Sequence, residues 1–361
     1  MVVDVDLKPI NSDEVDLKRP IIVAGPCSAE SEEQMLETAK GVAAAGVKIF
    51  RAGIWKPRTR PNAFEGVGTE GLKWFKTVQK ETGLLVATEV ANTKHVYEAL
   101  KYGVDIIWIG ARTSANPFAV QDIADSLRGV KIPVMIKNPV NPDVDLWVGA
   151  IERINNAGIQ QIVAIHRGFS TYDKSIFRNA PHWQLPIELR RRIPEIPMLT
   201  DPSHIAGKRE LIYDICQKAM DLNFDGLIIE THCNPDKALS DAKQQVTPDA
   251  LKEILGRLIL RDPEVKEQLM LSLAVMRDKI DKLDDKLINL IDERMSIVGE
   301  IGEYKKDNNI TILQNKRWDD MLKNRLTLGN KHKLSEDFIT KLFSAIHQES
   351  INKQTTIMNE G

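Results

Sequence analysis

The sequence contains little cysteine, no long apolar run and almost no net charge, and each absence excludes a class of protein. Its three cysteines form neither an even-numbered disulfide framework nor a zinc-finger spacing, which favours a reducing compartment such as the cytoplasm. It has no stretch of about 18 apolar residues, so no membrane-spanning helix is expected. The acidic N-terminus lacks the apolar core of a secretion signal. With a formal net charge of −2, nothing suggests nucleic acid as a partner.

Short apolar runs recur along the first two thirds of the chain and are separated mostly by helical patterns. They are rich in Val, Ile and Leu on both faces, as parallel strands buried on both sides should be. The runs cover residues 21–25, 47–53, 84–90, 106–112, 134–139, 161–168, 198–204 and 227–232. Eight strand–helix units predict a (β/α)8 barrel, also called a TIM barrel. A doubly wound sheet is the alternative, but the glycine-rich fingerprint that usually follows its first strand is absent.

Nearly every run ends in a charged or metal-binding side chain. These residues are Cys27, Arg51, Glu89, Arg112, Lys137, Arg167, His204 and Glu230. The active site of such a barrel is built at the C-terminal ends of its strands, so we expect them to surround one mouth. Lys56 and Arg58, in the loop "IWKPRTRP", add to the cations. Six cations around one mouth indicate an anionic ligand that carries phosphate, with some pairing to acids such as Glu89.

A second set of these residues combines a thiol, an imidazole and carboxylates. Its members are Cys27, His204, Glu230 and, in "ALSDAKQQ", Asp241. Mixed donors of this kind suit Mn, Fe, Co or Zn, and such a metal can act as a Lewis acid on a carbonyl. Spacing alone leaves the assignment open, because other histidines compete: His95, His166, His182 and His232. Position alone also allows Cys27 to be a nucleophile, a redox sensor or a core residue.

The pattern changes to helices only after residue 262. Apolar residues then alternate at spacings of four and three: Leu269, Leu273, Met276, Ile280, Leu283, Leu287 and Leu290. This predicts one long amphipathic helix that ends near residue 306, followed by helices near 312–326 and 335–354. Periodicity alone favours a coiled-coil dimerisation tail.

The motifs "GPCS", "KPRT", "IGART", "IKNP", "IHRG", "DPSH", "ETHCNP" and "SDAKQQ" together resemble one enzyme family over about residues 20–262. It is the β subgroup of type I 3-deoxy-D-arabino-heptulosonate 7-phosphate (DAHP) synthase. That family condenses phosphoenolpyruvate with erythrose 4-phosphate and releases phosphate, in the first step of the shikimate pathway. The sister family that makes 3-deoxy-D-manno-octulosonate 8-phosphate is the alternative. Its loop typically reads "KANR" where this chain has "KPRT", which favours the four-carbon sugar.

The resemblance implies a role for each barrel residue. The implied metal ligands are Cys27, His204, Glu230 and Asp241. The residues implied to hold phosphoenolpyruvate are Arg51, Lys56, Arg112, Lys137 and Arg167. Arg58 and Thr59 are implied to meet erythrose 4-phosphate. Those expected to take a direct part in catalysis are Cys27, Lys56, Lys137 and His204.

The tail resembles the all-helical chorismate mutase over about residues 265–355. The positions that match its chorismate- and prephenate-binding residues are Arg277, Arg294, Lys305, Arg317, Ser350 and Gln354. Of these, Arg294, Lys305 and Gln354 are the expected catalytic residues. Chorismate is a dicarboxylate, so several cations suit it, and charge stabilisation at its ether oxygen accelerates the rearrangement. The family often has acids where this chain has Gln314 and Trp318, which could alter mutase activity.

Helix geometry and chain organisation add three expectations. Arg277 and Arg294 are 17 residues apart, about 25 Å along a helix, so one small ligand cannot touch both from one chain. We therefore expect a homodimer. We also expect an N-terminal extension (1–20), a barrel (21–262) and a helical domain (263–361). The extension is too short for the ferredoxin-like regulator that some relatives carry, so the helical domain is expected to mediate inhibition by prephenate or chorismate.

Overall fold

A computed structural model describes residues 2–9, 19–56, 64–172, 175–261 and 267–359. The contacts divide the chain into two compact units, Met1–Pro263 and Glu264–Gly361, and each is described by itself. The predicted domain boundary at 262/263 lies outside the described residues.

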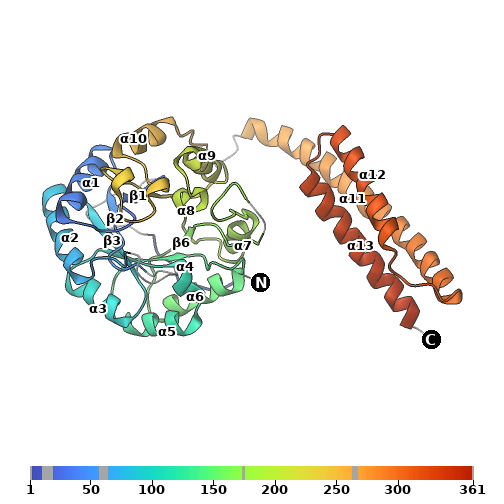
Figure 1. The fold of residues 1–361 in the computed structure, drawn as a ribbon, viewed down its shortest axis with the longest axis horizontal. Coiled ribbons are helices and arrows are strands. Elements are labelled where there is room, and N and C mark those ends of the chain that lie inside the picture. The colour runs from blue at the N-terminus through green and yellow to red at the C-terminus, as the bar shows by residue number, and fades with distance from the viewer. Residues whose placement is uncertain (1, 10–18, 57–63, 173–174, 262–266, 360–361) are drawn as a thin grey trace. The chain divides into compact units, whose positions relative to one another are not determined.

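The first unit is a closed barrel of eight parallel strands in sequence order (Figure 1). The strands are β1 (Ile21–Gly25), β2 (Ile49–Arg51), β3 (Leu85–Val90), β4 (Ile106–Ile109), β5 (Val134–Lys137), β6 (Ile162–His166), β7 (Met198–Thr200) and β8 (Gly226–Glu230). β1 pairs with β8 in register from Ile21 opposite Gly226 to Gly25 opposite Glu230. This pairing closes the sheet, so the barrel prediction is confirmed and the doubly wound alternative is wrong.

Helices surround the strands, as Figure 1 shows. They are α1 (Glu32–Ala44), α2 (Thr69–Thr82), α3 (Thr93–Lys101), α4 (Ala111–Ser114), α5 (Pro117–Ser126), α6 (Val144–Asn156), α7 (Gln184–Arg192), α8 (Pro202–Ala206), α9 (Ile212–Asp221) and α10 (Pro248–Arg257). Several begin at side-chain caps: Ser31, Asn92, Asp143 and Thr247 each accept a hydrogen bond from a backbone N–H in the first turn. Such caps satisfy N–H groups that have no partner inside the helix.

The barrel has two apolar layers. The inner layer fills the space enclosed by the strands with side chains such as Ile49, Trp108, Met135 and Ile228. The outer layer lies between the strands and the helices. Strands buried on both faces explain why the runs are apolar without alternation.

Several strands are shorter than the apolar runs predict, and in two of them the difference places a site residue on a helix. β4 stops at Ile109 and β7 at Thr200, and short helices follow, so Arg112 lies on α4 and His204 on α8. Pro202 has no N–H to give to a strand ladder and instead occupies the first turn of α8. The expectation that Arg112 and His204 end their strands is therefore wrong by a few residues, although both still follow the C-terminal ends.

Part of the N-terminal extension is hydrogen-bonded to the end of the barrel at which the strands begin. The Val3 N–H donates to the Arg192 carbonyl at 2.8 Å, at the end of α7, and the Lys8 N–H donates to the Gln160 carbonyl at 2.9 Å, just before β6. Val3, Val5 and Leu7 pack against the outer apolar layer.

The second unit consists of α11 (Glu267–Asp307), α12 (Asn315–Lys331) and α13 (Glu336–Asn359). These match the three predicted helices. α13 packs on both α11 and α12, and at Gly302 a Cβ would lie 3.3 Å from the Gln354 Cγ, so α11 and α13 approach closely. Many apolar side chains of α11 are exposed in the single chain: Met276, Ile280, Leu283, Leu287 and Leu290. No helix of the described residues is long and apolar enough to cross a membrane.

Candidate active sites

A polar cleft lies at the C-terminal ends of the barrel strands. It has a cavity volume of about 220 Å³ and is lined by Lys56, Glu89, Ala111, Arg112, Lys137, Val140, Arg167, Arg178, His204 and Asp241. Five of the eight predicted strand-end residues thus meet at one mouth, as barrel geometry requires: Glu89, Arg112, Lys137, Arg167 and His204.

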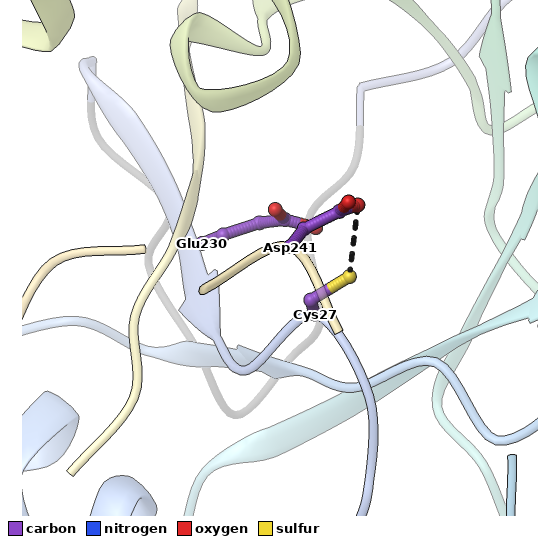
Figure 2. Close-up of side chains that lie close together, drawn as sticks. All are labelled: Cys27, Glu230 and Asp241. Atoms are coloured by element: carbon purple, nitrogen blue, oxygen red, sulfur yellow. Dashed lines mark hydrogen bonds between the residues drawn. The ribbon is translucent and has the colours of Figure 1, made fainter. Parts of the chain in front are cut away.

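Cys27, Glu230 and Asp241 form a compact group at this mouth; we call it the donor group. Their Sγ and carboxylate oxygens all lie within 4.8 Å of one another. Figure 2 shows the Cys27 and Asp241 side chains meeting, with Sγ 3.5 Å from Asp241 Oδ2. Thiolate and carboxylate donors this close together can hold one divalent transition metal.

Backbone geometry explains how the three donors converge. Gly25 ends β1 with φ = +148°, and a Cβ there would lie 2.1 Å from the Arg51 carbonyl oxygen, so glycine is needed where the chain turns toward Cys27. Glu230 is the last residue of β8. Asp241 has φ = +46°, a left-handed conformation that aspartate tolerates better than most residues.

The thiol of Cys27 is buried and faces an amine. The Lys56 Nζ lies 3.1 Å from Sγ and 3.0 Å from the Cys27 carbonyl oxygen. Burial, assisted by Glu230, raises the pKa of Cys27 to about 12 in the metal-free protein. A thiol with so high a pKa is a poor nucleophile, and the two carboxylates beside it favour the role of metal ligand.

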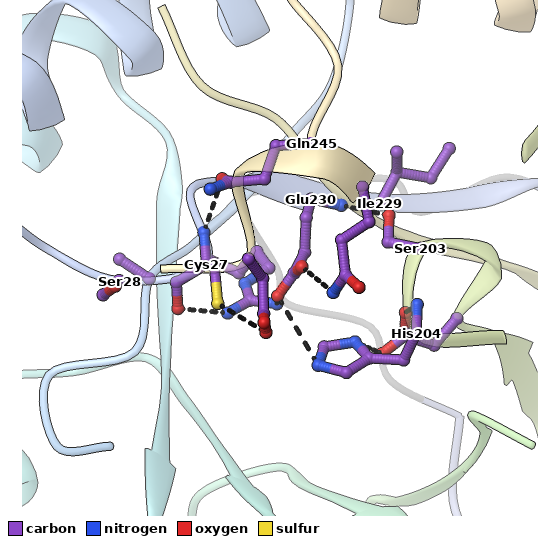
Figure 3. A network of polar contacts seen from close by, with 12 residues as sticks. Cys27, Ser28, Ser203, His204, Ile229, Glu230 and Gln245 are labelled. Atoms are coloured by element: carbon purple, nitrogen blue, oxygen red, sulfur yellow. Dashed lines mark hydrogen bonds and ion pairs between the residues drawn. The ribbon is translucent and has the colours of Figure 1, made fainter. Parts of the chain in front are cut away.

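His204 lies beside the donor group and is oriented by a carboxylate that the sequence reading missed. Its Nδ1 lies 2.8 Å from Asp201 Oδ2 and its Nε2 lies 3.7 Å from Glu230 Oε1 (Figure 3). Asp201 is fully buried and also pairs with Lys137 Nζ at 2.8 Å. Its position directly after β7, in the motif "DPSH", was the available signal. A histidine held this way presents its other nitrogen to a metal.

Arg51 contacts the donor group from within the barrel. It is 1% exposed, its NH1 lies 3.1 Å from Glu230 Oε1, and its NH2 donates to the Cys27 carbonyl at 3.0 Å. Its guanidinium also lies over the Trp108 ring, 4.8 Å from the centroid. Arg51 does not line the cleft in this structure, so its contact with phosphoenolpyruvate stays a prediction.

The other predicted cations lie in the cleft. Lys56, Arg112, Lys137 and Arg167 all line it. Arg178, which the sequence reading missed because it follows no strand, joins them and pairs with Asp241 at 3.0 Å. Burial raises the pKa of Asp241, but His204, Arg178 and Lys56 outweigh it and bring the pKa to about 2. The predicted residues Arg58 and Thr59 lie outside the described residues.

The competing histidines and cysteines do not join the donor group. His166 Nε2 donates to the Pro181 carbonyl at 2.6 Å, and His95 stacks on Trp55. His232 Nε2 lies 3.5 Å from Glu30 Oε2. Cys216 is a buried core residue of α9, and the Cys233 N–H donates to Thr38.

The helical unit gathers polar side chains between α11 and α13. Arg294 NH1 donates to Ser350 Oγ at 2.7 Å, and Lys305 Nζ donates to the Ile312 carbonyl at 2.6 Å. Gln354 is 8% exposed, and its Oε1 has no hydrogen-bond partner among the described residues. Arg277 and Arg317 are exposed. An unsatisfied buried amide oxygen is costly, and a ligand donor would relieve that cost.

Trp318 and Gln314, at which the resemblance led us to expect acids, lie in different surroundings. The Trp318 ring stacks on His347 with centroids 4.0 Å apart. Gln314 lines a groove with Tyr304 and Lys305.

Two family models match the chain. Residues 14–265 match the DAHP synthetase I family, and residues 276–355 match chorismate mutase type II. The chain belongs to the DAHP synthetase I family. It therefore carries a DAHP synthase domain followed by a chorismate mutase domain, and both predicted resemblances are confirmed. A type I DAHP synthase is a transferase and the mutase is an isomerase, which supports a bifunctional shikimate-pathway enzyme.

One relative and one solved structure agree with this DAHP synthase assignment, and a second relative carries the name of an eight-carbon sister enzyme at lower identity. The phospho-2-dehydro-3-deoxyheptonate aldolase of Thermotoga maritima is 35% identical over 237 residues, which cover 66% of this chain and 68% of the relative. The crystal structure of the T. maritima DAHP synthase superposes with a TM-score of 0.62 at 30% identity, covering 70% of this chain and 72% of that one. The 2-dehydro-3-deoxyphosphooctonate aldolase of Thioalkalivibrio sulfidiphilus is 27% identical over 274 residues, covering 71% and 94%.

His166 makes the stability of the synthase barrel depend on pH. Burial lowers its pKa from 6.5 to about 4 despite the bond to Pro181. Between these two pH values the imidazole is protonated in the unfolded chain but neutral in the folded barrel. The contribution of His166 to the free energy of unfolding is therefore fully present above pH 6.5 and is lost as the pH falls toward 4. In urea unfolding of the metal-free protein, the free energy of unfolding should fall by about 2 kcal/mol between pH 7.5 and pH 5 because of His166. His166→Gln should reduce the pH dependence by that amount; an unchanged pH dependence would contradict the assignment.

Proposed function

We propose that the barrel condenses phosphoenolpyruvate with erythrose 4-phosphate at a divalent transition metal held by Cys27, His204, Glu230 and Asp241. The observation that carries the proposal is the donor group, whose ligand atoms lie within 4.8 Å of one another beside a cleft lined with cations. When bound, the metal would supply Lewis-acid polarisation of the sugar aldehyde. The mixed sulfur, nitrogen and oxygen donors admit Mn, Fe, Co or Zn.

The cleft cations would bind and orient the anionic substrates. Arg112 and Arg167 offer planar forks to phosphate or carboxylate oxygens, and Lys137 is fixed by Asp201 at 2.8 Å. Burial lowers the pKa of Lys56, but Cys27 and Glu230 outweigh it and raise the pKa overall, so its ammonium stays charged. In the reaction the methylene carbon of phosphoenolpyruvate bonds to the aldehyde carbon, and the aldehyde oxygen takes up a proton. Water adds to the cation left at the phosphate-bearing carbon and loses a proton, and the bond from that carbon to the phosphate oxygen then breaks to release inorganic phosphate.

The helical domain would hold chorismate and accelerate its rearrangement to prephenate. Arg294 and Lys305 would present donors to the substrate oxygens. Ser350 donates its own O–H to the Ile346 carbonyl and accepts from Arg294, so it would orient that guanidinium. The buried Gln354 packs against Gly302 of α11. The rearrangement needs no nucleophile, because fixed donors stabilise the charge that develops at the ether oxygen.

A homodimer would complete this mutase site. Arg277 lies about 25 Å along α11 from Arg294 and is exposed in the single chain. The apolar side chains of α11 near it, from Met276 to Leu290, are also exposed. A second copy packed along α11 would bury them. Arg277 would then reach the site of the partner.

We also propose that the helical domain mediates inhibition of the synthase by prephenate or chorismate. The fusion of an early and a late enzyme of one pathway in a single chain supports this link. Cys27 can serve as a thiolate ligand only while it is reduced, so a reducing compartment such as the cytoplasm is the location that we propose for this enzyme.

Removing the thiol should separate the two activities. Cys27→Ser should abolish bound metal and lower the synthase turnover by at least about 100-fold, because a hard hydroxyl replaces a soft thiolate. The mutase turnover should stay within twofold of the wild type, about 0.4 kcal/mol. The measurements are metal content, phosphoenolpyruvate consumption and chorismate loss on one preparation. Cys233→Ser is the matched control and should change none of them; loss of both activities in Cys27→Ser would instead assign the thiol to the fold.

Two inactive mutase variants should restore each other. Arg294→Ala and Arg277→Ala should each abolish the loss of chorismate, while Lys341→Ala, which removes an exposed cation of α13, should not. In a random mixture of the two inactive chains, half of the dimers are mixed and each contains one intact site, so about a quarter of the wild-type activity should return. A co-expressed mixture that stays inactive would mean that Arg277 and Arg294 do not act across chains.

Inhibition of the synthase should depend on the mutase site. In the intact chain, prephenate should inhibit the wild-type synthase but not the Arg294→Ala variant, because its binding residue is gone. A chain ending before residue 263 should likewise be insensitive. Inhibition of this truncated barrel as strong as that of the intact enzyme would contradict the regulatory role.

A further inference from the structure

Two consecutive glutamines lie directly behind the donor group. Gln244 and Gln245 are 1% and 0% exposed and follow Asp241 in the motif "SDAKQQ". Burying a polar amide is costly unless all of its hydrogen-bonding groups find partners. In each of these amides both the oxygen and the nitrogen form a hydrogen bond. Each bond is made to a residue of the donor group or to a residue that contacts or precedes one of its members.

Gln245 ties together the two loops that carry Cys27 and Asp241. Its Oε1 accepts from the Cys27 N–H at 2.9 Å, and its Nε2 donates to the Ser240 carbonyl at 2.8 Å. Ser240 immediately precedes Asp241, and its hydroxyl also bonds to that of Ser28, the residue after Cys27. Figure 3 shows the Gln245 amide reaching the Cys27 backbone. The Gln245 amide, together with the Ser28–Ser240 bond, therefore links the loop that carries the sulfur donor to the loop that carries the Asp241 carboxylate.

Gln244 fixes the third donor from the same turn. Its Nε2 donates to Glu230 Oε2 at 2.6 Å, which leaves Oε1 toward Arg51 and His204. Its Oε1 accepts from Arg178 NH1 at 2.6 Å, and the same NH1 pairs with Asp241 Oδ1. The amide thus orients one carboxylate directly and the other through Arg178.

We infer that Gln244 and Gln245 are positioning residues that set the mutual placement of Cys27, Glu230 and Asp241 for metal binding. The inference rests on the metal site of the proposed function. Neither glutamine lines the cleft, and neither belongs to the donor group. Partners of this kind orient ligands, and their loss typically weakens metal affinity by about 10- to 100-fold.

The test is titration of the metal-free full chain with Co²⁺, read by its thiolate-to-cobalt absorption. Gln245→Leu should weaken Co²⁺ binding by about 10- to 100-fold and shift or diminish that band, because the Cys27 backbone loses its anchor. Gln244→Leu should weaken binding similarly but keep the band, since it touches Glu230 and not Cys27. Gln245→Glu keeps an acceptor for the Cys27 N–H, so its affinity should lie between those of the wild type and Gln245→Leu.

Gln217→Leu is the matched control. On α9, Gln217 also bonds a backbone N–H and a carbonyl, both of Ile259, but it does not line the cleft. It should lower thermal stability without changing Co²⁺ affinity or absorption. Mutase turnover reports that the helical unit is folded, and the thermal unfolding of each variant reports whether the barrel is folded.

The outcomes separate the two hypotheses. If Gln245→Leu binds Co²⁺ with wild-type affinity and an unchanged band, and only its thermal stability falls as in Gln217→Leu, the glutamine is a purely structural residue and the inference is overturned. If the wild type itself shows no thiolate-to-cobalt band, the donor group is not the metal site, and the proposed function fails together with the inference.

Discussion

The barrel mouth is organised around one fully buried carboxylate, that of Glu230. A lone buried charge would cost several kcal/mol, so its position is tenable only with compensating partners. Arg51 reaches it from inside the barrel, Gln244 from the following turn and His204 from α8. Burial alone would raise the pKa of Glu230, but His204 and Arg51 outweigh it and lower it, so the group is ionised and available as a donor.

This arrangement explains why acids and cations share one mouth without neutralising it. Asp201 binds Lys137 and His204, and Asp241 binds Arg178, so the carboxylates orient cations as well as surround the donor group. The cleft can therefore offer positive charge to phosphate on one side while thiolate and carboxylate oxygens converge on the other. In a (β/α)8 barrel the two sets come from different strands, which fixes them independently.

Much of this architecture is predictable from the sequence. Runs that are apolar on both faces identify the buried parallel strands, and the residues that follow them identify the mouth. Asp201 and Arg178 escaped prediction for different reasons. Asp201 lies inside an apolar run that predicts strand up to residue 204, whereas Pro202 ends β7 and Asp201 caps α8. Arg178 follows no strand, and only the folded loop brings it to Asp241. The roles of Gln244 and Gln245 depend on buried hydrogen bonds, which leave no periodic pattern.

The uninterrupted length of α11 has a consequence for how this enzyme responds to dilution. In the proposed dimer one rigid helix contributes Arg294 to its own site and Arg277 to the other, so a bound ligand bridges two chains. Ligand binding and chain association are then thermodynamically linked, and each strengthens the other. A pathway metabolite bound at these sites would stabilise the dimer against dissociation, and the fraction of dimer would then depend on the concentration of that metabolite.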